Sequence, residues 1–171
     1  MDMNGREVNV WKGVHGMPNK MLPGGYLVTS RGRRSGKYSV QDGLDIVQTD
    51  WDGNIVWKFD RNEFIEDPGT EGRWMARYHH DFQREGNPVG YFTPGMEPKA
   101  LEGNTLVLCH RNVRNTAISD KLLLDDLILE VDWNGEILWE WCCNEHCNEM
   151  DFRDGPKNRP CARPHYRATE R

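Results

Sequence analysis

The 171-residue chain has no long hydrophobic run, and its purely apolar stretches, such as 122–124 and 127–129, are at most four residues long. A membrane-spanning helix needs about 20 apolar residues, so the sequence predicts no membrane span. The start of the chain also lacks the apolar core of a secretory signal peptide, which predicts a cytoplasmic location for the chain as written. No long window repeats apolar side chains every 3.6 residues, and this absence argues against amphipathic helices.

Positive charge is also scarce. The chain has 22 Lys and Arg against 27 Asp and Glu, a net charge of −5, which argues against nucleic acid as a partner. The one basic run, residues 31–37, is short and flanked by Gly and Ser, and we expect a mobile loop there. Its spacing does not match a phosphate-binding loop of the Gly-x4-Gly-Lys type.

The cysteines are too few and too unevenly placed for a disulfide framework. Their number, five, is odd, which favours reduced thiols. Most lie near the C-terminal end in a group that resembles zinc ligands in composition: Cys142, Cys143, His146, Cys147, Cys161 and His165. The spacing does not match a regular pair of ligand knuckles, so we expect neither a metal nor a cofactor.

A repeated segment is the most informative feature of the sequence. Residues 45–59 read DIVQTDWDGNIVWKF and residues 127–141 read LILEVDWNGEILWEW. Aligned on Asp50 and Asp132, both contain Asp-Trp-[Asp/Asn]-Gly-x-Ile-[Val/Leu]-Trp-x-aromatic. A degraded third copy opens the chain at residues 2–11. Recurrence at the same place in each copy predicts that the tryptophans are structural: Trp51, Trp57, Trp133 and Trp139.

Each copy is typical of a strand, a tight turn and a returning strand. Side chains alternate before the shared Asp, and Asp-Gly or Asn-Gly supplies residues that tolerate positive φ. The turns are expected at 52–54 and 134–136. The expected strands are 45–50, 55–59, 105–110, 127–132 and 137–141.

A second element, at residues 22–28, recurs at 101–107 in the same order relative to the first. Units of about 45 residues with four strands are typical of β-propeller blades. The expected fold is therefore all-β, with two propeller blades and part of a third in residues 1–150, and with an inserted loop at about 61–100. Residues 151–171, rich in Arg and Pro, are expected to be a disordered or divergent tail.

Two blades cannot close a ring of the usual four to eight. The sequence therefore predicts a fragment of a longer protein. Its open blade faces would expose apolar side chains and unpaired strand edges, and we expect the isolated chain to self-associate.

The inserted loop contains the densest group of polar side chains. His79 and His80 precede Asp81, and His110 is the last residue of a predicted strand. Neighbouring residues of a strand point to opposite faces, so only one of the two adjacent histidines can face a given site. We expect that residue to be His80, on the same face as His110, with His79 pointing away and dispensable. A surface loop with a buried polar pair is the alternative.

Anions could be bound by arginines near these histidines, since a guanidinium can bind sulfate or phosphate through two parallel hydrogen bonds. The candidates are Arg77, Arg111 and Arg114. For each of them, a solvated residue at the rim is the alternative.

Four segments resemble a known family: GLDIVQ at 43–48, DWDGNIVW at 50–57, YHHDFQREGNPVGY at 78–91 and NTLVLCH at 104–110. Over roughly residues 5–148 the chain resembles the arylsulfotransferase family of β-propeller proteins. The resemblance implies transfer of a sulfuryl group from a small phenolic sulfate ester to a phenol, without a nucleotide donor or cofactor.

In this family a central histidine is transiently sulfated, while other histidines and an arginine hold the charged group. The implied catalytic residues are His79, His80 and His110, and the implied substrate-binding residues are Arg77, Arg111 and Asn112. The histidine that carries the sulfuryl group would lie in later blades, so the isolated chain is expected to be inactive. A non-catalytic propeller that serves as a binding or scaffolding module is the alternative.

Overall fold

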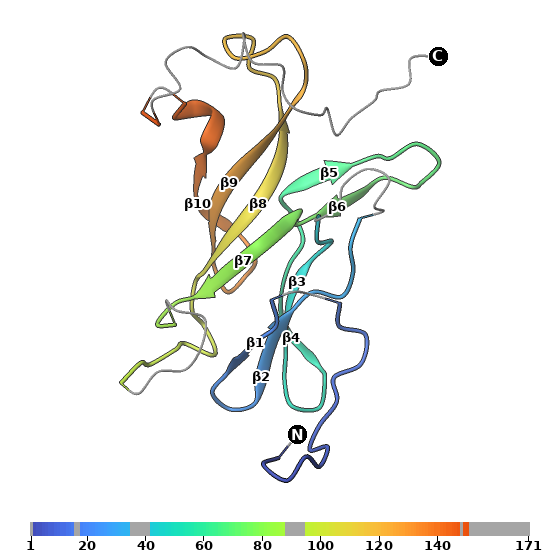
Figure 1. The fold of residues 1–171 in the computed structure, drawn as a ribbon, viewed down its shortest axis with the longest axis vertical. Coiled ribbons are helices and arrows are strands. Elements are labelled where there is room, and N and C mark those ends of the chain that lie inside the picture. The colour runs from blue at the N-terminus through green and yellow to red at the C-terminus, as the bar shows by residue number, and fades with distance from the viewer. Residues whose placement is uncertain (1, 16–17, 35–41, 88–94, 148, 151–171) are drawn as a thin grey trace.

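The structure, a computed structural model, describes residues 2–15, 18–34, 42–87, 95–147 and 149–150. As the sequence predicts, the regular elements in these residues are β-strands, apart from one 3-10 turn, η1 (Cys143–Glu145). The strands form three antiparallel sheets (Figure 1). None of the described residues belongs to a helix long and apolar enough to cross a membrane.

Two of the sheets are four-stranded meanders, in which each strand pairs with its neighbour in sequence. The first contains β1 (Lys20–Leu22), β2 (Tyr26–Thr29), β3 (Ile46–Thr49) and β4 (Ile55–Phe59). The second contains β7 (Tyr78–Arg84), β8 (Thr105–Val113), β9 (Leu123–Val131) and β10 (Ile137–Cys142). The five strands expected from the sequence are confirmed within two residues, except that β8 is longer and β9 begins earlier.

The region expected to be an inserted loop, about 61–100, contains three strands. β5 (Glu63–Ile65) and β6 (Arg73–Met75) form a small sheet of their own, and β7 is the edge strand of the second meander. Residues 88–94 of this region, and the whole tail 151–171, lie outside the described residues.

An aspartate side chain closes each expected hairpin turn. Oδ1 of Asp50 accepts hydrogen bonds from the N–H groups two and four residues ahead, at 3.0 and 2.8 Å. Asp132 repeats the pattern at 2.8 and 2.9 Å, and Asp2 repeats it at 2.8 and 2.9 Å. Three residues after each aspartate a glycine has a positive φ, of +77°, +88° and +82° in chain order. The same turn chemistry therefore recurs in all three segments.

One hydrophobic core joins the two meanders. Its members include Val28 and Phe59 from the first sheet and Val107, Leu127 and Leu129 from the second. Residues that alternate with them on the second sheet point to the other side, because the side-chain period of a strand is two. The second sheet therefore has a core face, which packs against the first meander, and an outer face on the opposite side.

Tryptophans link the meanders. The indole N–H of Trp57 donates to the carbonyl oxygen of Asp132 at 3.0 Å. The guanidinium of Arg84 lies over the rings of Trp57 and Trp133, 4.7 and 5.1 Å from their centroids. Burial lowers the pKa of Arg84 to about 10, and this cation between two indoles is part of the packing between the sheets. The expected structural role therefore fits Trp57 and Trp133.

The outer face of the second sheet is apolar and exposed. Trp139, which the repeat predicts to be structural, is 49% exposed there rather than packed in the core. Leu106, Leu124 and Ile128 are also exposed. We call the surface formed by these four side chains the open face.

Candidate functional site

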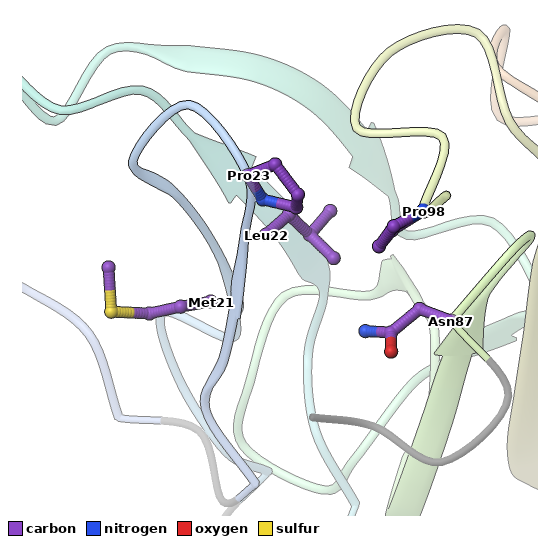
Figure 2. Close-up of a pocket in the computed structure, with 5 residues that line it drawn as sticks. All are labelled: Met21, Leu22, Pro23, Asn87 and Pro98. Carbon is purple, nitrogen blue, oxygen red and sulfur yellow. The ribbon is translucent and has the colours of Figure 1, made fainter. Parts of the chain in front are cut away.

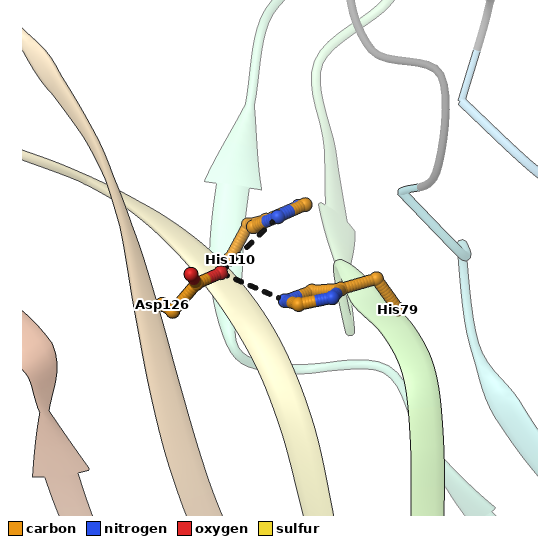
Figure 3. A group of neighbouring side chains, drawn as sticks. All are labelled: His79, His110 and Asp126. Carbon is orange, nitrogen blue, oxygen red and sulfur yellow. Dashed lines mark ion pairs between the residues drawn. The ribbon is translucent and has the colours of Figure 1, made fainter.

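Three polar side chains come together on the outer side of the second sheet, beside the open face (Figure 3). His110 on β8 lies directly opposite Asp126 on β9, and His79 is the second residue of β7. The imidazoles of His79 and His110 are stacked, with centroids 3.7 Å apart and planes at 15°. Oδ1 of Asp126 lies 3.0 Å from Nε2 of His79 and 3.4 Å from Nε2 of His110. We call these residues the His-His-Asp cluster.

The structure corrects which of the adjacent histidines faces His110. Tyr78 enters the core opposite Cys109, so His79, the next residue, points to the outer face. A bulge between Tyr78 and Phe82 then breaks the alternation. His80 lies in that bulge with a φ of +58° and is exposed to solvent. The expectation that His79 points away from His110 is therefore wrong.

Asp42 holds His110 from the other side. Oδ1 of Asp42 lies 2.7 Å from Nδ1 of His110, and the carboxylate is fully buried. The chain next to Asp42 is fixed to β7, because Gly43 donates its N–H to the carbonyl of Tyr78 at 2.8 Å. With Nδ1 engaged, Nε2 of His110 is the nitrogen that faces Asp126 and solvent.

Two arginines keep Asp42 ionised. Its Oδ2 accepts hydrogen bonds from Arg34 at 3.0 Å and from Arg77 at 2.9 Å. Burial acts to raise the pKa of Asp42, but the hydrogen bond from His110 and the two guanidiniums hold it well below its usual range. Arg34 belongs to the basic run that was expected to be a mobile loop, yet it is buried and also pairs with Asp67. Residues 35–37 of that run lie outside the described residues.

The expected anion-binding arginines are engaged elsewhere. Arg77 is buried and pairs with Asp42 and Glu63, so it acts on the cluster through Asp42. Arg111 donates to Asn62 and Glu140, both at 2.9 Å.

Alternation along β8 also places Arg111 on the opposite face of the sheet from His110. Asn112 shares the face of His110, and its backbone N–H donates to Glu63 at 3.2 Å. Arg114 is exposed beyond the end of β8.

His79 is the most buried member of the cluster. Its side chain is only 5% exposed, and neither ring nitrogen makes a hydrogen bond of normal geometry in the described part of the chain. Burial, and next to it the proximity of His110, lowers the pKa of His79 to about 4. The imidazole is therefore neutral at pH 7, with a free lone pair on one nitrogen.

This arrangement allows two kinds of chemistry. A histidine whose Nδ1–H is held by a carboxylate can act through Nε2 as a nucleophile or general base. Alternatively, one ligand atom from each member of the cluster could bind a metal ion, because the three atoms lie within 4.8 Å of one another. The sequence analysis missed Asp42 and Asp126. Asp126 directly precedes a predicted strand, but no pattern in the sequence places it opposite His110 or links Asp42 to His110.

Two cavities of the described residues are lined by side chains outside the cluster. One of about 340 Å³ is lined by Met21, Leu22, Pro23, Asn87 and Pro98 (Figure 2). Another, of about 490 Å³, is lined by several cations, among them Lys58, Arg61 and Arg73. Neither is lined by a histidine.

The group that resembles zinc ligands is only partly described. Cys142, Cys143 and Cys147 are free thiols. The ring of His146 stacks on Trp141, with centroids 4.8 Å apart, and its Nδ1 lies 3.0 Å from Glu149. Cys161 and His165 lie outside the described residues.

Comparison of the chain with protein-family models, with curated proteins and with solved structures finds no match.

Proposed function

We propose that the chain is part of a β-propeller protein that transfers a sulfuryl group between phenolic sulfate esters and phenols, with His110 as a catalytic residue. The observation that carries the proposal is the 2.7 Å contact between Oδ1 of Asp42 and Nδ1 of His110. An ionised carboxylate in this position fixes the tautomer and stabilises positive charge on the ring when Nε2 attacks. The resemblance of the sequence to arylsulfotransferases supplies the substrate class.

In the proposed reaction Nε2 of His110, rather than the histidine of a later blade that the resemblance implies, attacks the sulfur of an aryl sulfate ester. The bond between sulfur and the phenolic oxygen breaks, and the phenolate leaves. The oxygen of a second phenol then attacks the sulfur, the bond to Nε2 breaks, and the phenolic proton is released to a base. Asp126 would repel the donor ester, but its carboxylate is 59% exposed and can rotate into solvent.

The proposal requires cations that the described residues do not bring to the cluster, since Arg77 and Arg111 are paired with other side chains. In a propeller, side chains from several blades converge on the central channel, and further blades would supply these cations.

The two meanders are neighbouring blades in this proposal, and the open face packs against another blade. Their shared strand order and the Trp57–Asp132 bond between them support this arrangement.

Sulfuryl exchange from 4-nitrophenyl sulfate to a second phenol, measured on the full-length gene product, tests the proposal. We expect His110→Ala to lower the rate at least about 100-fold. Asp42→Asn should lower it about tenfold or more, because the ring loses its orienting charge. His80→Ala is the matched control and should leave the rate within about twofold.

Unchanged exchange in His110→Ala would overturn the assignment of the catalytic residue. If the unmodified protein shows no exchange with any phenol tested, the alternative of a non-catalytic binding or scaffolding module is favoured.

A further inference from the structure

We propose that the His-His-Asp cluster binds a divalent transition-metal ion, with Zn²⁺ as the preferred ion. The inference is separate from the proposed function: Nε2 of His110 cannot bind an ion and attack sulfur at the same time, so a bound ion would block sulfuryl exchange.

The spacing of the ligand atoms is the first argument. Asp126 Oδ1 lies 3.0 Å from Nε2 of His79 and 3.4 Å from Nε2 of His110 (Figure 3). Ligand atoms bound tetrahedrally to zinc at about 2.0 to 2.1 Å are roughly 3.3 Å apart. Two sides of the triangle therefore already have the length that a bound ion requires.

The surroundings of His110 are the second argument. Metal-bound histidines usually donate their other ring N–H to a carboxylate, which fixes the tautomer and raises the basicity of the ligating nitrogen. Buried Asp42 stands in this position at 2.7 Å from Nδ1. The nitrogen left to bind an ion is Nε2, on the side of Asp126.

The unsatisfied state of His79 is the third argument. A buried imidazole with no well-formed hydrogen bond on either nitrogen is unusual, and a metal bond to Nε2 would satisfy it. Within the described residues the only ion-pair partners of Asp126 are the two imidazoles, so a cation would also supply the missing counter-charge.

The donor set selects the ion. Two imidazoles and one carboxylate suit Zn²⁺ and neighbouring transition metals, whereas Mg²⁺ and Ca²⁺ prefer oxygen ligands alone. Three protein ligands leave at least one position for water or another ligand. The rings of His79 and His110 are stacked with an interplanar angle of 15°. To direct both Nε2 lone pairs at one ion, the rings must open to a larger angle.

Co²⁺ and Zn²⁺ titrations of the purified chain, after treatment with a chelator, test the inference. We expect Co²⁺ to give visible d–d bands of a site with N and O ligands, without a thiolate charge-transfer band, and Zn²⁺ to displace it at one equivalent. Zn²⁺ should also shift the ring-proton NMR signals of His79 and His110 and leave that of His146 in place.

Variants distinguish this site from others in the chain. Asp126→Asn and His79→Ala should each weaken binding at least tenfold, and His80→Ala should leave it unchanged. Because the Asp126 carboxylate is largely exposed, Asp126→Asn should keep the fold, which circular dichroism verifies.

A thiolate band, binding that survives both Asp126→Asn and His79→Ala, or no saturable binding at micromolar Zn²⁺ would each overturn the inference. Metal binding is measured without any sulfuryl exchange, so these outcomes are independent of the exchange assay.

Discussion

The indole N–H of Trp57, on the first meander, donates to the carbonyl oxygen of Asp132, at the turn of the second meander, over 3.0 Å. The same relationship occurs one unit earlier, where the indole of Trp11 donates to the carbonyl of Asp50 at 2.9 Å. In both cases the acceptor belongs to an aspartate-closed turn. The contact between consecutive units is therefore specific in its donor and its acceptor.

Two substitutions of Trp57 should lower the free energy of unfolding by different amounts. Trp57→Phe keeps a ring in the core and loses the hydrogen bond, which should lower the free energy of unfolding by about 1 to 2 kcal/mol. Trp57→Ala also leaves a cavity and should lower it by about 3 to 5 kcal/mol. Urea unfolding followed by circular dichroism measures both. The control is Trp139→Ala, which should change stability by less than about 0.5 kcal/mol; an equal loss in this variant would contradict the assignment.

The hairpin turns that contain Gly53 and Gly135 should differ in how much stability they lose when the glycine is replaced by alanine. Gly53 and Gly135 have φ of +88° and +82°, so alanine at either position should cost about 1 to 2 kcal/mol through backbone strain. A Cβ on Gly53 meets nothing within 4 Å, whereas one on Gly135 lies 2.9 Å from the carbonyl oxygen of Lys58 on the other meander. Gly135→Ala should therefore lose a further ~1 to 3 kcal/mol in urea unfolding. Equal losses would mean that this turn does not touch the first meander.

Stability should fall between pH 6.5 and pH 4. The pKa of His79 is lowered on folding from 6.5 to about 4, so its neutral form is favoured in the folded state. Its contribution is complete above pH 6.5 and is lost as the pH falls through this window; after allowance for solvent screening it is about 2 kcal/mol. The pKa of Asp42 is also lowered, so its contribution disappears only at still lower pH, below about 4.

Unfolding free energies of the unmodified chain and of His79→Phe at pH 7 and pH 4.5 check this prediction. The variant keeps a ring to stack on His110 and should lose most of the difference between the two pH values. His80→Ala, the matched control, should retain it. A pH dependence that is the same in His79→Phe would assign the effect to other groups.

The open face should drive self-association of the isolated chain. Leu106 and Ile128 are among its exposed apolar side chains, and their contact with a second molecule would bury them. We expect sedimentation velocity to show concentration-dependent oligomers, and the double variant Leu106→Lys with Ile128→Lys to be monomeric. Met3→Lys, at a fully exposed residue away from this sheet, should leave the association unchanged. A chain that stays monomeric without any substitution would contradict the prediction.

Local patterns were sufficient to predict five of the eight strands of the two meanders and the two hairpin turns that Asp50 and Asp132 close. Alternating side chains and the Asp-Gly or Asn-Gly pairs act over a few residues, so the hairpins around Asp50 and Asp132 could be identified from the sequence. The strands within 61–100 could not, because β7 is a strand only through its pairing with β8.

The site depends on contacts that no local pattern encodes. The choice between His79 and His80 is made by the packing of Tyr78 in the core and by the bulge that follows. Asp42 and His110 are 68 residues apart, and they meet only because the chain after Asp42 pairs with the start of β7. The sequence could therefore predict that a histidine faces His110, but not which one, and it could not predict the carboxylate that orients it.

The bonds from Trp11 to Asp50 and from Trp57 to Asp132 run in one direction along the chain, from each indole to the turn of the next unit. A contact of this kind has a donor side and an acceptor side, so a twofold axis, which pairs identical surfaces, cannot satisfy it. Trp139 occupies the donor position of the last described unit, with its ring exposed. Assembly that repeats this contact is therefore head to tail, and it gives either a closed ring or, without closure, an open fibre.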